Sequence, residues 1–243
     1  MNKFLIGCIA DDFAGAEDAA AILTANGLRT VMTDGIPQDP DWDTDAEAIV
    51  IATNTRSIDP FEASREYLNA MRWLKRQKTG LFFFKYSSTF DSTRRGNIGT
   101  VTDALMNLLN IPYTVHVPTS LTGGCTVRDG ILYVNDVPLA ESPMKDHPLN
   151  PMWESHIPML IAPQSKYPCF VLTADDLDNP ERTREQIASW QAQRRRFHIA
   201  ADYWQPEHGA KIMEMFHELP LMAGGCDILA DFARFVKNSA PNC

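Results

Sequence analysis

Short apolar segments recur along the chain, and between most of them lie longer segments in which apolar side chains return with helical spacing. The apolar segments predict β-strands at Phe4–Ile9, Arg29–Met32, Ala48–Ala52, Leu81–Lys85, Tyr113–Val117, Cys169–Thr173 and Phe197–Ala200. The intervening segments predict helices at Ala16–Ala25, Pro60–Arg76, Ile98–Leu109, Pro180–Arg195 and Glu207–His217. Strands that alternate with helices imply right-handed crossovers. The pattern therefore predicts an α/β fold with a mostly parallel sheet flanked by helices on both faces, a Rossmann-like three-layer arrangement.

One segment, 119–151, departs from this alternation. It is rich in glycine and proline and contains "ILYVNDVPLAES", in which Asn135-Asp136 suits a turn between two strands. We therefore expect an antiparallel hairpin excursion at the edge of the sheet. No repeat, low-complexity tract or linker divides the sequence, so residues 1–235 are expected to form one domain and residues 236–243 a frayed tail.

Composition and charge narrow the classes of partner. The chain has 243 residues, of which 44% are hydrophobic, and a formal net charge of -9. An acidic balance argues against a general nucleic-acid or anionic-membrane surface, since both need a basic face. No apolar run approaches the roughly 18 to 20 residues that cross a bilayer, and "MNKFLIGCIADD" does not resemble an export signal.

The cysteines indicate the redox setting. Five are scattered without CxxC spacing, which signals neither a disulfide framework nor a zinc site. A reducing cytoplasm is the simplest localisation. The histidines do not cluster by spacing either, and His198, His208 and His217 fall on predicted strands or helices without evident partners. A metal site therefore has little support.

Polar side chains gather where the predicted strands end. Ligands of open parallel sheets bind outside the carboxyl ends of the strands. Asp11 and Asp12 follow the first strand, Arg56 follows the third, and Lys85 closes the fourth, "LFFFK". These groups suggest a site for a small polyhydroxylated anion, with the cations meeting its negative group and the carboxylates its hydroxyls.

Each of these residues also has a structural interpretation. Asp12 could cap the next helix, but a cap accounts for only one of the two adjacent carboxylates and leaves Asp11 unexplained. Arg56 taken alone could be an ordinary surface residue, whereas Lys85 ends a very apolar strand and is harder to dismiss. His147 lies among turn residues and could equally be a surface histidine.

The segment "FKYSSTFDSTRRGNIG", residues 84–99, is the richest in candidate chemistry. It offers hydroxyls, glycines that permit close backbone approach, and a helix that begins near Ile98 with unpaired amides. It matches neither a Walker A nor a GxGxxG sequence. "LTGGCT" and "AGGCD" could also form anion nests, or could be plain loops.

At these same residues the sequence resembles the four-carbon acid sugar kinases, most closely their 3-oxo-tetronate kinase branch. The matching segments occur in the family's order: "IGCIADDFAGAEDAA", "ATNTRS", "FKYSSTFDSTRRGNIG", "YTVHVPTSLTGGCTVRDGILYVNDVPLAESPMKDHPLNPM" and "LPLMAGG". The resemblance implies the N-terminal, substrate-binding domain of an ATP-dependent carbohydrate kinase that phosphorylates 3-oxo-tetronate, threonate or erythronate. It implies ATP and Mg²⁺ as cofactors, on a C-terminal domain that would begin where this chain ends at Cys243. The chain alone is expected to bind and not to phosphorylate.

The resemblance also assigns roles to residues. It implies that Arg56 or Lys85 holds the substrate carboxylate and that one of three carboxylates orients or deprotonates the attacking hydroxyl; which one stays open. The candidate catalytic residues are Asp11, Asp12 and Asp91. The candidate substrate-binding residues are Arg56, Lys85, Ser87, Ser92, Gly96, Asn97 and His147.

Three positions depart from the family pattern. Ala14 replaces a hydroxyl-bearing residue, Cys125 replaces an arginine, and Asp227 puts a charge where the family has glycine. These departures keep two hypotheses open. The first is a kinase that is completed by an ATP-binding part, which is either supplied by a separate chain or lost from this one. The second is a non-catalytic sugar-acid-binding module or a remnant of such a kinase. A third is an unrelated small-anion-binding protein. The sequence does not indicate the oligomeric state.

Overall fold

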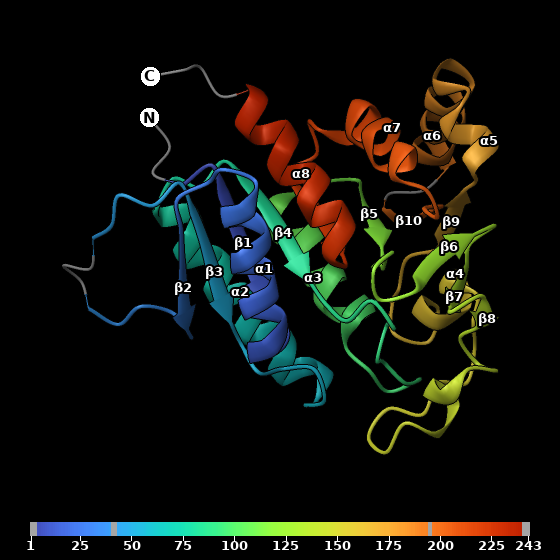
Figure 1. The fold of residues 1–243 in the computed structure, drawn as a ribbon, viewed down its shortest axis with the longest axis horizontal. Coiled ribbons are helices and arrows are strands. Elements are labelled where there is room, and N and C mark those ends of the chain that lie inside the picture. The colour runs from blue at the N-terminus through green and yellow to red at the C-terminus, as the bar shows by residue number, and fades with distance from the viewer. Residues whose placement is uncertain (1–3, 40–42, 194–195, 240–243) are drawn as a thin grey trace.

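The computed structural model describes residues 4–39, 43–193 and 196–239 and shows an eight-stranded, wholly parallel sheet between two layers of helices (Figure 1). The sheet order is β2-β3-β1-β4-β11-β5-β10-β9. The strands are β1 Ile6–Ala10, β2 Thr30–Asp34, β3 Ala48–Ala52, β4 Leu81–Lys85, β5 Tyr113–Val117, β9 Cys169–Leu172, β10 Phe197–Ala201 and β11 Leu221–Gly224. The predicted three-layer α/β class is confirmed.

Two buried apolar clusters hold the layers together, one on each face of the sheet. The first face carries α1 Phe13–Ala25, α5 Ala174–Leu177, α6 Pro180–Gln193, α7 Pro206–Phe216 and α8 Cys226–Ser239. The second carries α2 Pro60–Arg76, α3 Ile98–Leu109 and α4 Ile157–Ile161. The strands β1 and β3 are apolar and buried on both sides because helices cover both faces. None of the described helices is long and apolar enough to cross a bilayer.

The antiparallel excursion is confirmed as a second, three-stranded sheet of β6 Cys125–Arg128, β7 Ile131–Val134 and β8 Val137–Pro138, followed by a 3-10 turn at Pro143–Asp146. Asn135 and Asp136 form the β7–β8 turn with φ of 50° and 61°, the left-handed pair that a two-residue hairpin requires. Val127, Leu132 and Leu139 pack into the α2–α3 side of the core. The excursion is therefore fixed to the main domain.

The carboxyl ends of the central strands are level with one another. Ala10 pairs laterally with Ala52 of β3 and with Lys85 of β4. In the sheet, β2 and β4 lie on opposite sides of the adjacent pair β3 and β1. The connection that leaves β1 therefore runs toward β2, and the connection that leaves β3 runs the other way, toward β4. Connections that diverge from neighbouring strands open a crevice at their carboxyl ends. The residues that follow Ala10, Ala52 and Lys85 therefore meet there.

Several element boundaries differ from the prediction. β11 and α8 were not predicted, because "AGGCD" was interpreted as a loop, although the buried residues Ile228, Leu229 and Phe232 keep helical spacing. α8 continues through Ser239, so the tail begins later than residue 236; residues 240–243 lie outside the described residues. The helix expected over Pro180–Arg195 ends at Gln193, and residues 194–195 also lie outside them.

A buried chain of hydrogen bonds runs through the sheet. Tyr86 Oη lies 3.2 Å from His116 Nδ1, His116 Nε2 lies 3.0 Å from His198 Nδ1, and His198 Nε2 lies 2.9 Å from Asp103 Oδ1. Ser165 Oγ hydrogen-bonds both Asp103 Oδ1 and His198 Nε2. The sequence named no partner for His198, and the structure supplies one because β5 and β10 bring the two histidines together.

Candidate functional site

Asp11 and Arg56 form a bidentate salt bridge at the carboxyl ends of β1 and β3. Arg56 Nε and Nη2 each lie 2.9 Å from one oxygen of Asp11. The carbonyl of Asp11 also accepts from the amides of Thr55 and Arg56, at 2.7 and 3.1 Å. Side chain and backbone together therefore attach the β3–α2 loop to the end of β1, with the planar fork geometry that arginine and carboxylate favour.

Two further carboxylates converge on the same guanidinium. Arg56 Nη1 lies 2.9 Å from Asp12 Oδ2 and 3.5 Å from Asp91 Oδ2. Burial alone would lower the pKa of Arg56, but the hydrogen bonds that it donates to Asp11 and the charges of all three carboxylates raise it. Burial raises the pKa of Asp11, and the bonds from Arg56 oppose that shift. The guanidinium is thus held in its charged form at the centre of the cluster.

Asp12 has two contacts at once. Its side chain accepts from the amide of Gly15 at 2.7 Å and caps α1, while its second oxygen pairs with Arg56. The structure thus combines the two interpretations that the sequence left open for this residue. Among the described residues, the hydrogen bonds of the Asp11 side chain all come from Arg56 of the β3–α2 loop.

Asn97 holds the Arg56 loop from the other side. Its side-chain amide donates to the carbonyls of Thr55 at 2.7 Å and Ile58 at 3.2 Å. Asn97 is 3% exposed, so in this structure it positions Arg56 through the loop backbone. Its assignment as a substrate-binding residue stays a prediction.

Lys85 lies at the end of β4 and points toward the start of α1. It is 3% exposed, and a Cβ on Gly15 would lie 3.6 Å from its Nζ. Among the described residues Nζ donates one hydrogen bond, to the carbonyl of Tyr86 at 3.1 Å. An ammonium with donors to spare beside the first amides of a helix suits an anionic group.

His147 approaches the cluster from the excursion. Its Nε2 lies 4.0 Å from Asp91 Oδ1, and its Nδ1 accepts from the amides of Leu149 and Asn150 at 3.3 and 3.0 Å. Burial raises the pKa of Asp91, and the neighbouring His147 and Arg56 oppose that shift. A residue far along the chain thus closes the site opposite Arg56.

Ser87, Ser92 and Gly96 build the loop that carries Asp91. Ser87 Oγ bonds Thr89 Oγ1 at 2.8 Å. Ser92 is buried and accepts from Gln164 Nε2 at 3.0 Å, and a Cβ on Gly96 would lie 1.9 Å from Ser92 Oγ. Gln164, which also bonds the amide of Gly99 at 3.0 Å, was missed, because a lone glutamine beside a proline carries no sequence signal.

The three positions that depart from the family pattern lie around the same edge. Ala14 is exposed in the first turn of α1. Burial raises the pKa of Cys125 to about 11, so its side chain is a neutral thiol where the family has a positively charged arginine. Asp227 Oδ2 accepts from the amide of Leu121 at 2.5 Å, so its carboxylate fastens the β5–β6 connection to α8.

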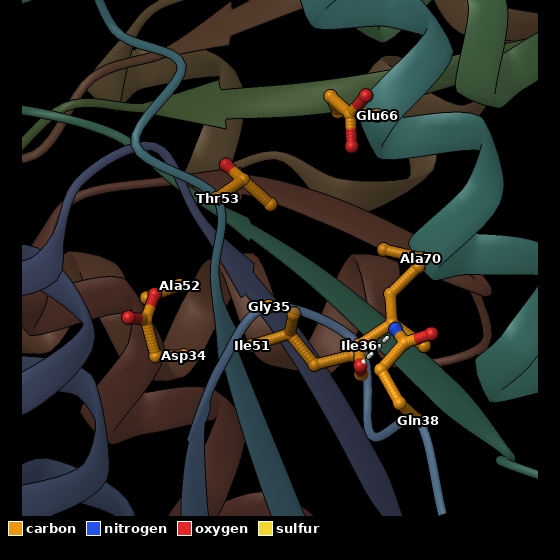
Figure 2. A pocket seen from close by; sticks show the side chains of 9 residues that line it. All are labelled: Asp34, Gly35, Ile36, Gln38, Ile51, Ala52, Thr53, Glu66 and Ala70. Carbon is orange, nitrogen blue, oxygen red and sulfur yellow. Dashed lines mark hydrogen bonds between the residues drawn. The ribbon is translucent and has the colours of Figure 1, made fainter.

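A cavity of about 260 Å³ opens beside β3 at this edge of the sheet. Figure 2 shows Ala52 and Thr53 next to it, with Glu66 and Ala70 reaching in from α2. Its lining consists of Asp34, Gly35, Ile36, Gln38, Ile51, Ala52, Thr53, Glu66 and Ala70. The lining includes two carboxylates and no cationic side chain, so the cavity is unsuited to an anion.

The cluster does not fit Mg²⁺. Three carboxylates would attract a cation, but the guanidinium of Arg56 lies where they converge. Across the described ranges, no group of three or more His, Cys, Asp or Glu side chains could hold a metal ion.

Comparison with known proteins agrees with the predicted resemblance. The family model described as "Sugar-binding N-terminal domain" matches residues 6–230. The chain belongs to this family. Over 231 residues it is 41% identical to the 3-oxo-tetronate kinase of Escherichia coli K12, covering 94% of this chain and 59% of that protein. The sugar-binding domain therefore spans somewhat more than half the length of this curated relative.

Solved structures share the fold of the sugar-binding domain. A Salmonella typhimurium LT2 protein superimposes with a TM-score of 0.91 at 38% identity, covering 98% of this chain and 57% of that one. A Bordetella bronchiseptica domain of unknown function, solved as a domain-swapped dimer with bound citrate, gives 0.79 at 25% identity, covering 95% and 55%. The parallel sheet and the excursion thus belong to a recurrent architecture.

Proposed function

We propose that this chain is the sugar-acid-binding half of an ATP-dependent kinase that acts on a four-carbon acid of the 3-oxo-tetronate, threonate or erythronate type. The observation that carries the proposal is the cluster of Asp11, Asp12 and Asp91 around Arg56, in a chain that matches the sugar-binding family over residues 6–230. Carboxylates suit the hydroxyls of such an acid, and the cations suit its carboxylate.

Of the two cations, Lys85 is the better candidate for the substrate carboxylate. Arg56 already meets three carboxylates, whereas Lys85 has donors to spare beside the start of α1. The citrate bound by the Bordetella bronchiseptica neighbour is also a hydroxylated carboxylate. Arg56 then orients Asp11, Asp12 and Asp91 toward the hydroxyls.

Phosphoryl transfer needs charge neutralisation around the nucleotide phosphates. ATP and Mg²⁺ are therefore proposed for the part of the relatives that lies beyond this domain, whether on the same polypeptide or on a separate chain. The proposed setting is the cytoplasm, in keeping with the free thiols of Cys8, Cys125, Cys169 and Cys226.

Calorimetric titration with erythronate, threonate and 3-oxo-tetronate, with and without ATP, tests the proposal. At least one acid is expected to bind, and Lys85→Met is expected to weaken that binding at least tenfold, because a charge-assisted hydrogen bond is lost. Lys75→Met, on the exposed end of α2, is the matched control and should bind normally. Absence of heat with all three acids contradicts the proposal.

A second candidate function is binding without phosphoryl transfer. The observation that favours it is the change at Cys125 and Asp227, which places a neutral thiol and a carboxylate where the family has arginine and glycine. A chain that binds a sugar acid, but gives no phosphorylated product when an ATP-binding half of a relative is added, would support this function over the kinase.

A further inference from the structure

Asp91 and His147 face each other across the candidate site without touching. His147 Nε2 lies 4.0 Å from Asp91 Oδ1, which is beyond hydrogen-bond range. Asp91 Oδ1 is buried and has no hydrogen-bond partner among the described residues. A carboxylate oxygen that is buried and unpaired destabilises the fold, so its presence calls for an explanation.

The loop around His147 fixes which ring nitrogen carries the proton. Nδ1 lies 3.0 Å from the amide of Asn150 and 3.3 Å from that of Leu149. Both amides are donors, so Nδ1 must accept and Nε2 must carry the hydrogen. His147 therefore presents an N–H donor toward Asp91, and Asp91 presents an acceptor toward His147.

The second oxygen of Asp91 is already engaged. Oδ2 lies 3.5 Å from Arg56 Nη1, which turns Oδ1 toward His147. Asp91 itself sits in the left-handed region, with φ of 47°, where few side chains are tolerated and Asp and Asn are favoured. The backbone thus holds the carboxylate in an unusual place, and its orphan oxygen points into the site.

We propose that Asp91 and His147 form a slot for one hydroxyl of the sugar acid, which donates to Asp91 Oδ1 and accepts from His147 Nε2. This inference rests on the proposed function, because it assigns a role to two residues of the same site. A hydroxyl is both donor and acceptor at one oxygen, which is what the pair demands. A carboxylate in the slot would be repelled by the negative charge of Asp91. An ammonium has no acceptor for the N–H of His147.

The geometry needs little adjustment to admit that hydroxyl. An oxygen bonded to both groups at about 2.8 Å would hold them roughly 4 to 4.6 Å apart. The side chain of His147 is 28% exposed and lies on a loop tied to the β3–α2 connection by the bond from Asn150 Nδ2 to Ser57 Oγ, at 3.2 Å. A small outward turn of the ring therefore opens the slot without unfolding the loop.

Two substitutions at His147 separate the slot from loop structure. His147→Asn keeps an oxygen near Nδ1 for the two amides but no longer reaches Asp91, whereas His147→Ala loses both contacts. If the slot exists, both variants bind the sugar acid about tenfold or more weakly in calorimetry, while only His147→Ala lowers the thermal unfolding midpoint. If His147 merely shapes the loop, His147→Asn binds like the wild type, which overturns the proposal.

Asp91→Asn tests the acceptor. Its oxygen is expected to turn toward Arg56, which leaves an amide donor facing the N–H of His147 and no acceptor for the hydroxyl. Asp136→Asn is the matched control, because Asp136 also has a positive φ, of 61°, but its side chain is 80% exposed in the β7–β8 turn. Asp91→Asn should weaken binding at least tenfold, and Asp136→Asn should not change it.

Analogues of the best-binding acid that lack one hydroxyl complete the test. The 2-, 3- and 4-deoxy acids are each titrated into the wild type and into Asp91→Asn. For the acid that lacks the hydroxyl bound in the slot, the substitution should not lower the affinity further, because the slot is already empty. For the other two acids it should still lower the affinity at least tenfold. An equal loss for all three overturns the slot. Failure of the wild type to bind any sugar acid overturns the proposed function instead, so the two failures are distinguishable.

Discussion

Arg56 bonds Asp11 through two parallel contacts, from Nε and from Nη2, each 2.9 Å long and each to a separate carboxylate oxygen. The pair joins the ends of two adjacent strands, and it is shielded, since only 4% of the Asp11 side chain is exposed. Asp12 and Asp91 complete the ring of charge around the same guanidinium. The candidate site is therefore organised by a cation, and the positions of its carboxylates depend on that cation.

Removing one member of this pair should destabilise the domain. Asp11→Ala leaves the guanidinium without its two-pronged partner, and we expect a loss of about 3 kcal/mol in the free energy of unfolding. Urea denaturation measures it. Asp45→Ala is the control, because the Asp45 side chain is 95% exposed and lies 3.9 Å from Arg29, so that pair should contribute under about 1 kcal/mol. Equal midpoints for the two variants would contradict the assignment.

Gly96 should tolerate no side chain while Ser92 is present. A Cβ on Gly96 would lie 1.9 Å from Ser92 Oγ and 3.0 Å from Ser92 Cβ. We expect Gly96→Ala to cost about 2 kcal/mol in thermal or urea unfolding. The double variant with Ser92→Gly removes both contacting atoms of Ser92 but also the hydrogen bond that Ser92 accepts from Gln164, so it should recover part of that loss. A double variant no more stable than Gly96→Ala would show that the clash does not decide the effect.

The fold followed from the sequence because helical and strand periodicities are local. Alternating apolar runs and amphipathic segments predicted α2, α3 and β3 to β5 with their observed bounds. β11 and α8 were missed because two glycines and a cysteine where the strand ends and the helix begins suggested a loop. Those glycines instead let backbones approach closely: a Cβ on Gly225 would lie 2.3 Å from the carbonyl oxygen of Thr119.

The site followed only in part. The rule that ligands bind at carboxyl ends of parallel strands brought Asp11, Arg56 and Lys85 to one edge, and their lateral register places them there. No local pattern predicts that Asp91 would meet Arg56 by way of a left-handed turn, or that His147 would approach from the excursion. Such meetings depend on tertiary packing between distant segments.

Asp91→Asn should make the domain more stable at neutral pH even as it weakens binding. Burial raises the pKa of Asp91, so the folded state holds its proton more tightly than the unfolded chain does, and ionisation destabilises the fold. Removing the charge should add about 1 kcal/mol at pH 7. The gain should shrink as the pH falls through the raised pKa toward the ordinary carboxyl value. Urea unfolding at pH 7 and at about pH 4, near the ordinary carboxyl value, measures it, and a variant less stable than the wild type at pH 7 would contradict it.

The buried histidine pair should make stability depend on pH near neutrality. Burial, and then the charge of His198, lower the pKa of His116 well below its ordinary value of 6.5. Above about pH 6.5 His116 is neutral in both states and imposes no penalty. As the pH falls below that value, the unfolded chain takes up a proton that the folded state refuses, so stability falls by up to about 1.4 kcal/mol per pH unit until the lowered pKa is reached.

His116→Gln isolates this contribution. Glutamine does not titrate but can still bond His198, so the variant should lose about 1 to 2 kcal/mol at pH 8, from the broken contact with Tyr86, and decline less than the wild type between pH 8 and pH 5.5. Urea unfolding at both pH values gives the two slopes. Parallel slopes would show that His116 is protonated in the folded state as readily as in the unfolded chain, contrary to its place inside the sheet.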